Sequence, residues 1–164
     1  CWKQSTGIKN FTGYLPQKIT LPESMTGLQF FRFLADLRNR KSLEKAIRTA
    51  DAFELDTSKK IRDLNQEEKK KLAIAGVFLH DPEVLLLDEP AAGMNPNETA
   101  ELMDTIRFVR DNFDMTVLLI EHDMSLVSGI CEKLSVLNFG QLLCEGKTAE
   151  VLKNPEVITA YLGE

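Results

Sequence analysis

The sequence predicts an α/β protein in which a parallel sheet is combined with a helical subdomain. An unbroken apolar run at residues 84–87 is bounded by turn signals, which is typical of a strand buried on both faces. Predicted strands and helices then alternate to the end of the chain, which favours a parallel, doubly wound sheet. The residues before this section carry apolar side chains mainly at helical spacing, so we expect a helical insertion there.

The first half of the chain is expected to be mainly helical. A short strand followed by a loop is predicted within residues 7–17, where β-compatible residues end in a proline. Helices are predicted at 24–37, at 42–52 and from Asn65 onward. His80, which comes at the end of the third helix, is expected to face solvent.

The second half is expected to alternate between strands and helices. After the strand at 84–87, the predicted elements are a helix at 97–112, a strand at 116–120, a helix at 124–131, strands at 134–138 and 142–144 around a turn at Gly140, a helix ending at Lys153 and a last helix from Pro155 to Leu162. No internal repeat is visible in the sequence.

Composition and charge exclude several classes of function. The chain has 164 residues, which suits one domain or one domain with a small subdomain. Its formal net charge of −5 argues against a nucleic-acid partner. No stretch approaches the roughly 20 apolar residues of a membrane span, so we expect no direct membrane insertion. The three cysteines lack metal-ligand spacing, and because the chain starts at Cys1 we expect a processed protein or a piece of a longer one.

Acidic and imidazole side chains follow two of the predicted strands directly. Asp88 and Glu89 end the run "VLLLDEP", and His122 lies in "VLLIEHD" at the end of another strand. In a parallel sheet the carboxyl ends of strands open into the same crevice, so we expect these three side chains to converge. One acid placed for Mg²⁺, a second placed to orient or deprotonate a water, and a polar sensor of the phosphoryl group form a phosphoryl-transfer site.

These motifs resemble those of a known family. "LLLDEPAAGMNP" followed by "VLLIEHDM" looks like the Walker B strand, D-loop and switch-histidine strand of ATP-binding cassette (ABC) ATPases, and "GYLPQ" looks like their Q-loop. The tail "NPEVITAYLGE" is similar to the ATP-binding subunits of branched-chain amino-acid importers, whereas "MTGLQFFRFLADLR" looks more like multidrug-type exporters. The resemblance implies a partial ABC nucleotide-binding domain with a P-loop NTPase-like fold.

The resemblance implies a role for each matched residue. Gln17 would help ligate Mg²⁺ and report to the transport partner, and Asp88 would hold Mg²⁺ through water. Glu89 would act as general base, and His122 would contact the γ-phosphate of ATP. Asn95 stands where many members of the family have Asp in the D-loop, and it is expected to face nucleotide.

The resemblance also implies three domain segments and a signature helix. The segments are a strand and Q-loop region at 1–22, a helical signature subdomain at 23–81, and an α/β core at 82–164. Asn65 and Gln66 would begin the signature helix, which in the family meets the ATP held by the opposite subunit.

The sequence departs from the family pattern in two places. The P-loop motif G-x-x-x-x-G-K-[ST], which cradles phosphates, does not occur in it. The signature, usually Leu-Ser-Gly-Gly-Gln, reads "LNQEE" here. Asn65 followed three residues later by Glu68 predicts a capping box, so we expect this helix start to be occupied by the chain's own side chains. Glu67 and Glu68 would also repel a γ-phosphate there.

Two functions from different classes remain open at this stage. The first is an ATP-binding and ATP-hydrolysing subunit of an ABC transporter, of the amino-acid importer type. It would use ATP and Mg²⁺, pair with a second nucleotide-binding subunit, and bind a transmembrane permease at the cytoplasmic face of the cell membrane. The second is a non-catalytic or engineered ABC-derived scaffold that does not bind ATP. We expect this chain alone to have weak or absent ATP binding and no turnover.

Overall fold

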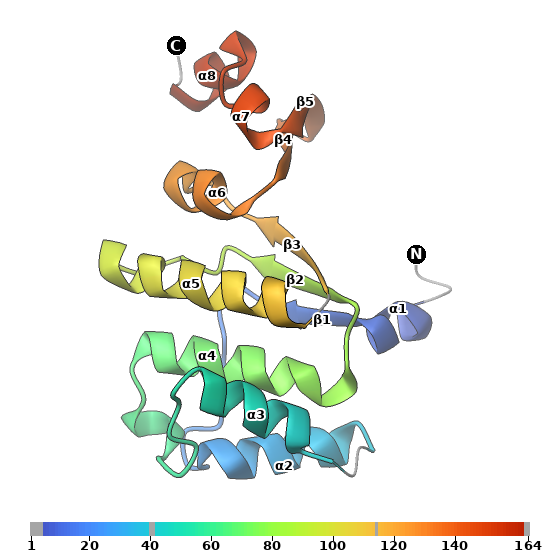
Figure 1. Cartoon of the computed structure of the whole chain (residues 1–164), viewed down its shortest axis with the longest axis vertical. Coiled ribbons are helices and arrows are strands. Elements are labelled where there is room, and N and C mark those ends of the chain that lie inside the picture. The colour runs from blue at the N-terminus through green and yellow to red at the C-terminus, as the bar shows by residue number, and fades with distance from the viewer. Residues whose placement is uncertain (1–4, 40–41, 114, 163–164) are drawn as a thin grey trace. The chain divides into compact units, whose positions relative to one another are not determined.

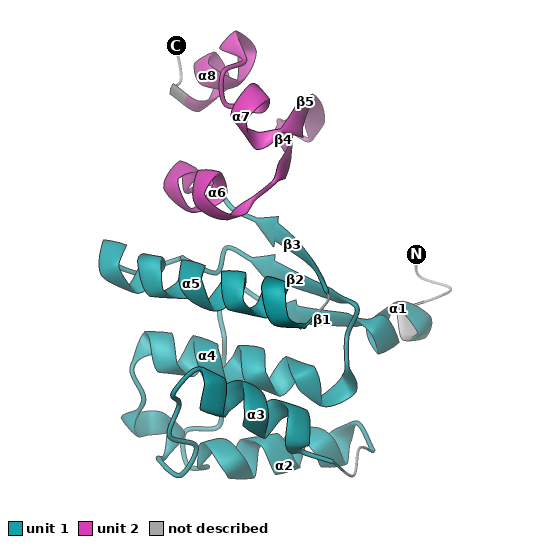
Figure 2. Ribbon diagram, viewed as in Figure 1, with its two compact units in different colours: residues 1–121 teal, residues 122–164 magenta. Residues whose placement is uncertain are grey.

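The computed structural model describes residues 5–39, 42–113 and 115–162 of the chain. It divides into two compact units, residues 1–121 and residues 122–164 (Figure 2). The boundaries of these two units differ from those of the three domain segments expected from the sequence. The three segments stay a prediction.

A three-stranded parallel sheet forms the centre of the first unit (Figure 1). Its strands β1 (Thr12–Leu15), β2 (Val84–Asp88) and β3 (Thr116–Ile120) lie in the order β1-β2-β3. Both neighbouring pairs run parallel, which confirms the predicted parallel sheet. Leu15 lies opposite Leu87 and Asp88 lies opposite Ile120, so the three carboxyl ends reach the same edge.

The two faces of this sheet differ in burial. Leu15, Leu85 and Leu87 are buried on one face, and they are related by the register of β1 and β2. On the other face Leu86 is half-buried and Leu118 is 55% exposed. The prediction that the strand at 84–87 is buried on both faces is therefore wrong. Its apolar residues point alternately to a packed face and to an open one.

Helix α4 is the central helix of the first unit, and most of the other helices lie beside it (Figure 1). The helices are α1 (Ser5–Phe11), α2 (Gly27–Leu37), α3 (Glu44–Ala52), α4 (Gln66–Val77) and α5 (Pro96–Asn112), with short 3₁₀ turns η2 (Ile61–Asp63) and η3 (Phe78–His80). Helix α4 packs against α2, α3 and α5. Its residues 72–76 are all buried, as expected of a helix with neighbours on several sides.

Gly76 shows why α4 tolerates a residue with poor helix propensity. A Cβ atom built on Gly76 would lie 2.9 Å from Cδ1 of Leu34 and 3.5 Å from Cε1 of Phe30, both on α2. The absent side chain lets the two helices approach closely. This packing offsets the cost of a helical glycine, about 1 kcal/mol relative to alanine.

Two local predictions are wrong. Residues 5–11 form helix α1, and the predicted strand is confined to β1; Ile8 and Phe11 are three residues apart, which is helical spacing. His80 is only 5% exposed and does not face solvent. Its Nε2 lies 3.1 Å from the carbonyl oxygen of Thr12, because the turn after α4 brings the chain back to the start of β1.

The second unit contains a β-hairpin and three short helices. Its elements are α6 (Met124–Ile130), β4 (Lys133–Asn138), β5 (Gln141–Lys147), α7 (Thr148–Val151) and α8 (Pro155–Leu162). The strands β4 and β5 pair antiparallel, and they are joined at Phe139 and Gly140, which have φ angles of 46° and 78°. Two consecutive left-handed residues are what a tight two-residue hairpin requires, so the turn predicted at Gly140 is confirmed.

No helix among the described residues combines the length and the apolar character needed to cross a bilayer.

Gly13 provides a test of how β1 packs against the end of α4. A Cβ atom on Gly13 would overlap Cγ1 of Val77 and would also touch Pro82 and Leu85. We expect Gly13→Ala to lower the free energy of unfolding by about 1–3 kcal/mol, the usual cost of overpacking. The measurement is equilibrium denaturation in urea, followed by circular dichroism.

Two further variants make this test specific. Gly7→Ala introduces the same methyl group where no atom lies within 4 Å, so it should not destabilise the chain. Adding Val77→Ala to Gly13→Ala should recover part of the lost stability, because it removes the overlapping methyl groups. Equal stability of the Gly13 and Gly7 variants would contradict the described packing.

Candidate functional site at the carboxyl ends of β1, β2 and β3

Asp88 is the last residue of β2, and it is in contact with β1. The phenol O–H of Tyr14 donates a hydrogen bond of 3.1 Å to Oδ2 of Asp88. This hydrogen bond, with smaller contributions from burial and from the charge of Asp88, raises the pKa of Tyr14. The carboxylate therefore lies at the strand end where the sequence predicted it, and it already accepts a hydrogen bond from a neighbouring strand.

Glu89 is held by both strands that flank β2. The side-chain Nε2 of Gln17, two residues beyond β1, donates a hydrogen bond to Oε2 of Glu89. The backbone N–H of Glu89 donates to the carbonyl oxygen of Ile120 at the end of β3, at 2.8 Å. Of the site residues predicted from the sequence, the structure thus brings Gln17 into contact with Glu89, directly beside Asp88.

The turn that follows Glu89 contacts two residues that the motifs did not single out. Nζ of Lys70, on α4, donates to the carbonyl oxygen of Pro90. Oε1 of Glu121, the residue after β3, accepts a hydrogen bond of 3.0 Å from the N–H of Ala91. Glu121 carries the same sequence signal as Asp88 and Glu89, because it is an acid at the carboxyl end of a parallel strand. Lys70 carries no comparable signal.

His122 follows Glu121 and is the first residue of the second unit. The strand before it, β3, lies directly beside β2. The predicted approach of His122 to Glu89 concerns residues of different units, and it stays a prediction.

Asn95 serves as the N-cap of α5. Its Oδ1 accepts hydrogen bonds from the N–H groups of Asn97 at 2.9 Å and of Glu98 at 3.1 Å. Oε2 of Glu98 in turn accepts from the N–H of Asn95 at 2.9 Å, which completes a capping box. The side-chain oxygen of Asn95 is therefore engaged in fixing the start of α5, and its predicted role towards nucleotide stays a prediction.

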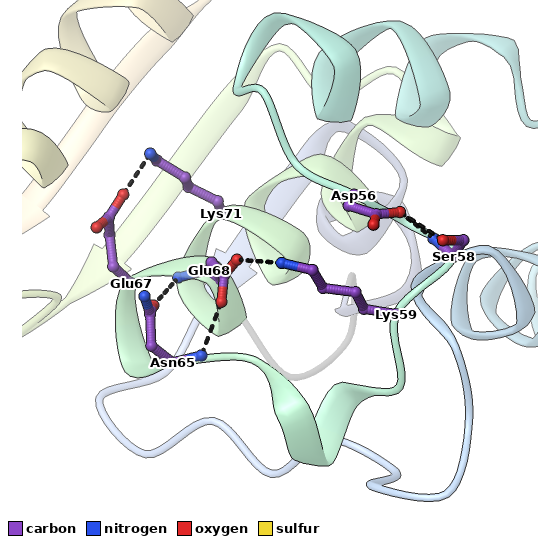
Figure 3. A network of polar contacts seen from close by, with 7 residues as sticks. All are labelled: Asp56, Ser58, Lys59, Asn65, Glu67, Glu68 and Lys71. Carbon is purple, nitrogen blue, oxygen red and sulfur yellow. Dashed lines mark hydrogen bonds and ion pairs between the residues drawn. The ribbon is translucent and has the colours of Figure 1, made fainter.

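The start of α4 is closed by the chain's own side chains (Figure 3). Oδ1 of Asn65 accepts from the N–H of Glu68 at 2.8 Å, and Oε2 of Glu68 accepts from the N–H of Asn65 at 2.9 Å. These two bonds confirm the capping box predicted from "LNQEE". Nζ of Lys59 lies 3.5 Å from Oε1 of Glu68, so the carboxylate also faces a cation. Gln66 is exposed as the first residue of the helix.

Glu67 is paired with residues on both α4 and α5. It forms an ion pair with Lys71, one helical turn away (Figure 3), and a hydrogen bond with Glu101. Burial acts to raise the pKa of Glu67, but the hydrogen bonds with Lys71 and Glu101 outweigh burial and lower it. The hydrogen bond with Glu67 and then its negative charge raise the pKa of Glu101. The negative charge expected at this helix start is therefore partly compensated.

The residues at the sheet edge offer oxygen ligands that suit Mg²⁺, whereas the capped start of α4 offers no open donors for a phosphate of the nucleotide. Mg²⁺ prefers oxygen ligands and is commonly held by one or two carboxylates together with phosphates of a substrate. Asp88 supplies a carboxylate and Gln17 an amide oxygen, which fits that donor set. Within the described residues, no group of three His, Cys, Asp or Glu side chains could hold a metal by itself. The helix start at Asn65, already capped, offers no open set of N–H groups to a phosphate.

Comparison with protein families identifies the chain. The model of the ABC transporter family matches residues 3–92, which is more than half of the sequence. The chain belongs to the ABC transporter family. A second model, described as branched-chain amino acid ATP-binding cassette transporter, matches residues 141–164, where the importer-like tail was noted.

Similar curated proteins are ATP-binding proteins of transporters. The chain is 50% identical to the high-affinity branched-chain amino acid transport ATP-binding protein LivG of Salmonella typhimurium over 97 residues, which is 59% of this chain and 38% of LivG. It is 37% identical to the energy-coupling factor transporter ATP-binding protein EcfA1 of Methanospirillum hungatei over 121 residues, 72% of this chain and 42% of EcfA1. These matches span about two fifths of the length of either relative.

Solved structures confirm the α/β fold of an ABC ATP-binding domain. The cbiO1 component of the ABC transporter complex cbiONQ of Clostridium perfringens superposes with a TM-score of 0.81 at 25% identity, over 96% of this chain and 65% of cbiO1. An ATP-binding cassette of an ABC transporter in its ADP conformation gives a TM-score of 0.81 at 22% identity, over 98% and 71% of the two chains.

The pair of Glu67 and Glu101 predicts how stability depends on pH. Because the folded-state pKa of Glu101 is raised, its ionisation disfavours the folded state once the pH exceeds the ordinary glutamate range. Glu101→Gln removes this charge, so we expect a higher melting temperature than that of the parent chain at pH 7. The difference should disappear near pH 3, where Glu101 is protonated in the folded and unfolded states alike. Thermal denaturation at the two pH values measures it.

A matched control separates this pair from a general effect of net charge. Glu23→Gln removes the same charge from an exposed position on another segment, and it should not reproduce the rise at pH 7. A melting temperature for Glu101→Gln that equals or falls below that of the parent chain at pH 7 would refute the pairing with Glu67.

Proposed function

We propose that this chain acts as part of the ATP-binding and ATP-hydrolysing subunit of an ABC transporter of the branched-chain amino acid importer type. The observation that carries the proposal is the contact between Gln17 and Glu89, directly beside Asp88. It joins two of the site residues that the sequence motifs indicated, and the third, Asp88, precedes Glu89 in the chain. The importer type is supported by the similarity to LivG and by the family match at residues 141–164.

Each of these side chains suits a step of phosphoryl transfer to water. Glu89 is the general base: its carboxylate orients the attacking water and accepts its proton. Gln17 would help to ligate Mg²⁺, and Asp88 would hold it through water. Because Gln17 donates through its nitrogen to Glu89, its oxygen is the atom through which it ligates a cation. A bound Mg²⁺ would neutralise the negative charge that develops on the phosphate oxygens.

The remaining site residues act at the edges of the nucleotide. His122 contacts the γ-phosphate, and Asn95 lies in the loop that faces a second nucleotide-binding subunit. In this role the capping box of Asn65 and Glu68 opens, so that Asn65 and Gln66 at the start of the signature helix meet the ATP of that second subunit. The helical subdomain at residues 23–81 and the Q-loop region at 1–22 transmit the state of the site to a transmembrane permease. The subunit lies at the cytoplasmic face of the cell membrane and is bound there through that permease.

One observation favours the second candidate, an ABC-derived scaffold that does not bind ATP. The start of α4 is satisfied by Asn65 and Glu68. A phosphate that approached this helix start would have to displace Glu68 and would meet the charge of Glu67. Two uncompensated unit charges about 4 Å apart repel by about 4 kcal/mol at an effective dielectric constant near 20, and the ion pairs of Glu67 with Lys71 and of Glu68 with Lys59 reduce that repulsion. A helix N-terminus returns only about 0.3–2 kcal/mol.

Substitution of Glu89 tests the proposed function. In the full-length product of the gene that encodes this sequence, we expect Glu89→Gln to lower ATP turnover by about 10²–10⁴-fold, the usual contribution of a general base. Binding of ATP should be retained, because the variant keeps the size and polarity of the side chain. The measurement is steady-state release of phosphate with Mg²⁺ and ATP.

Glu83→Gln is the matched control, because it makes the same change at the exposed residue before β2 and far along the strand from the carboxyl end. It should leave turnover unchanged. Equal turnover in the Glu89 and Glu83 variants would contradict the assignment of the base. If the unsubstituted full-length protein does not hydrolyse ATP, the second candidate function, a scaffold that does not bind ATP, would be favoured. For the 164-residue chain itself, calorimetry with ATP and Mg²⁺ should give a dissociation constant in the millimolar range or weaker.

A further inference from the structure

The peptide group between Pro90 and Ala91 is held at both of its polar atoms. Its carbonyl oxygen accepts from Nζ of Lys70, and its N–H donates to Oε1 of Glu121 at 3.0 Å. The two partners come from different elements, since Lys70 lies on α4 and Glu121 follows β3. Because a peptide group is planar, hydrogen bonds at its two opposite polar atoms restrict how far it can tilt.

This peptide group is separated by Pro90 from Glu89, the strained residue of the site. Glu89 has a φ angle of 43°, a left-handed conformation that residues other than glycine rarely adopt. Such a conformation persists only where the surroundings hold it. The ring of Pro90 fixes its own φ, so few freely rotating bonds separate Glu89 from the fixed peptide group. Restraining this peptide group therefore also restrains the backbone of Glu89.

Lys70 is an unusual residue for a purely structural role. Its side chain is on a helix with access to solvent at other positions, yet only 6% of the residue is exposed. Burial lowers the pKa of Lys70, and the negative charges of Glu121 and Glu98 act in the opposite direction. A buried cation is costly unless it has polar partners, and here they are a carbonyl oxygen and nearby carboxylates.

We propose that Lys70 and Glu121 are positioning residues that clamp the peptide group of Pro90 and Ala91 and thereby aim the carboxylate of Glu89 at Gln17. The clamp connects the signature helix α4 to the general base, so a displacement of α4 moves the base. The role of the clamp in catalysis rests on the proposed function of Glu89. The hydrogen bonds of the clamp do not rest on it, because they are present in the folded chain without nucleotide.

The test is nuclear magnetic resonance of the chain without nucleotide. The side-chain amide of Gln17 reports its hydrogen bond to Glu89, and a Glu89→Ala variant supplies the signal of Gln17 without that bond. We expect Lys70→Met to shift the Gln17 signal at least halfway towards the Glu89→Ala position. Lys70→Arg, which can still donate to the carbonyl oxygen, should restore most of the parent position.

Two controls distinguish positioning from a general loss of structure. Lys69→Met makes the same change at the neighbouring position of α4 and should leave the Gln17 signal unchanged. The backbone amide of Glu68, which is part of the capping box, should keep its chemical shift in all the Lys70 variants. A Lys70→Met variant in which both signals move indicates that α4 itself has been disturbed, and it would overturn the proposal.

Glu121→Ala provides an independent route if Lys70→Met does not fold. It removes the acceptor of the Ala91 N–H, so we expect at least tenfold faster hydrogen exchange at Ala91 together with a shift of the Gln17 signal. Faster exchange at Ala91 with an unchanged Gln17 signal would overturn the proposal, since the peptide group would then be free to move without affecting Glu89. Neither result depends on ATP turnover, so this test and the test of the proposed function can fail separately.

Discussion

The register of the parallel pairing of β1, β2 and β3 is the constraint on which the rest of the site depends. Leu15 lies opposite Leu87, and Asp88 lies opposite Ile120, so the residues after each strand meet at one edge. A shift of one residue would turn the buried leucines towards the open face and move Asp88 away from Tyr14. Burial of one face therefore fixes the position of the acids.

Helix α4 joins this sheet edge to the helical part of the first unit. It is buried along residues 72–76, and it begins at the capping box of Asn65 and Glu68. Lys70, between these two sections, contacts the turn after β2. One helix thus carries the position at which the signature is expected, the central core contact of the helical part and a direct hydrogen bond to the turn after Glu89. The start of α4 and the sheet edge are parts of one packed unit.

The sequence predicted those features that local patterns encode. The apolar run at 84–87 predicted β2, and the spacing of Asn65 and Glu68 predicted the capping box. Both features depend on residues that are close together in the sequence. Burial of His80 was missed, since its contact with Thr12 comes from tertiary structure. The helix at Ser5–Phe11 was missed because the β-compatible residues there were given more weight than the helical spacing of Ile8 and Phe11. The contact of Gln17 with Glu89 required knowledge of the strand order. Lys70 had no signal, because a lysine in a helix ordinarily faces solvent.

Interstrand nuclear Overhauser contacts in the 164-residue chain measure the central register directly. The account predicts backbone contacts that place Tyr14 beside Leu86 and Leu86 beside Leu118, with the residues on either side following in step. It also predicts a contact between the side chains of Gln17 and Glu89. Contacts displaced by one residue in either pair, or an antiparallel pattern, would contradict it and would remove the basis for a shared site at the carboxyl ends.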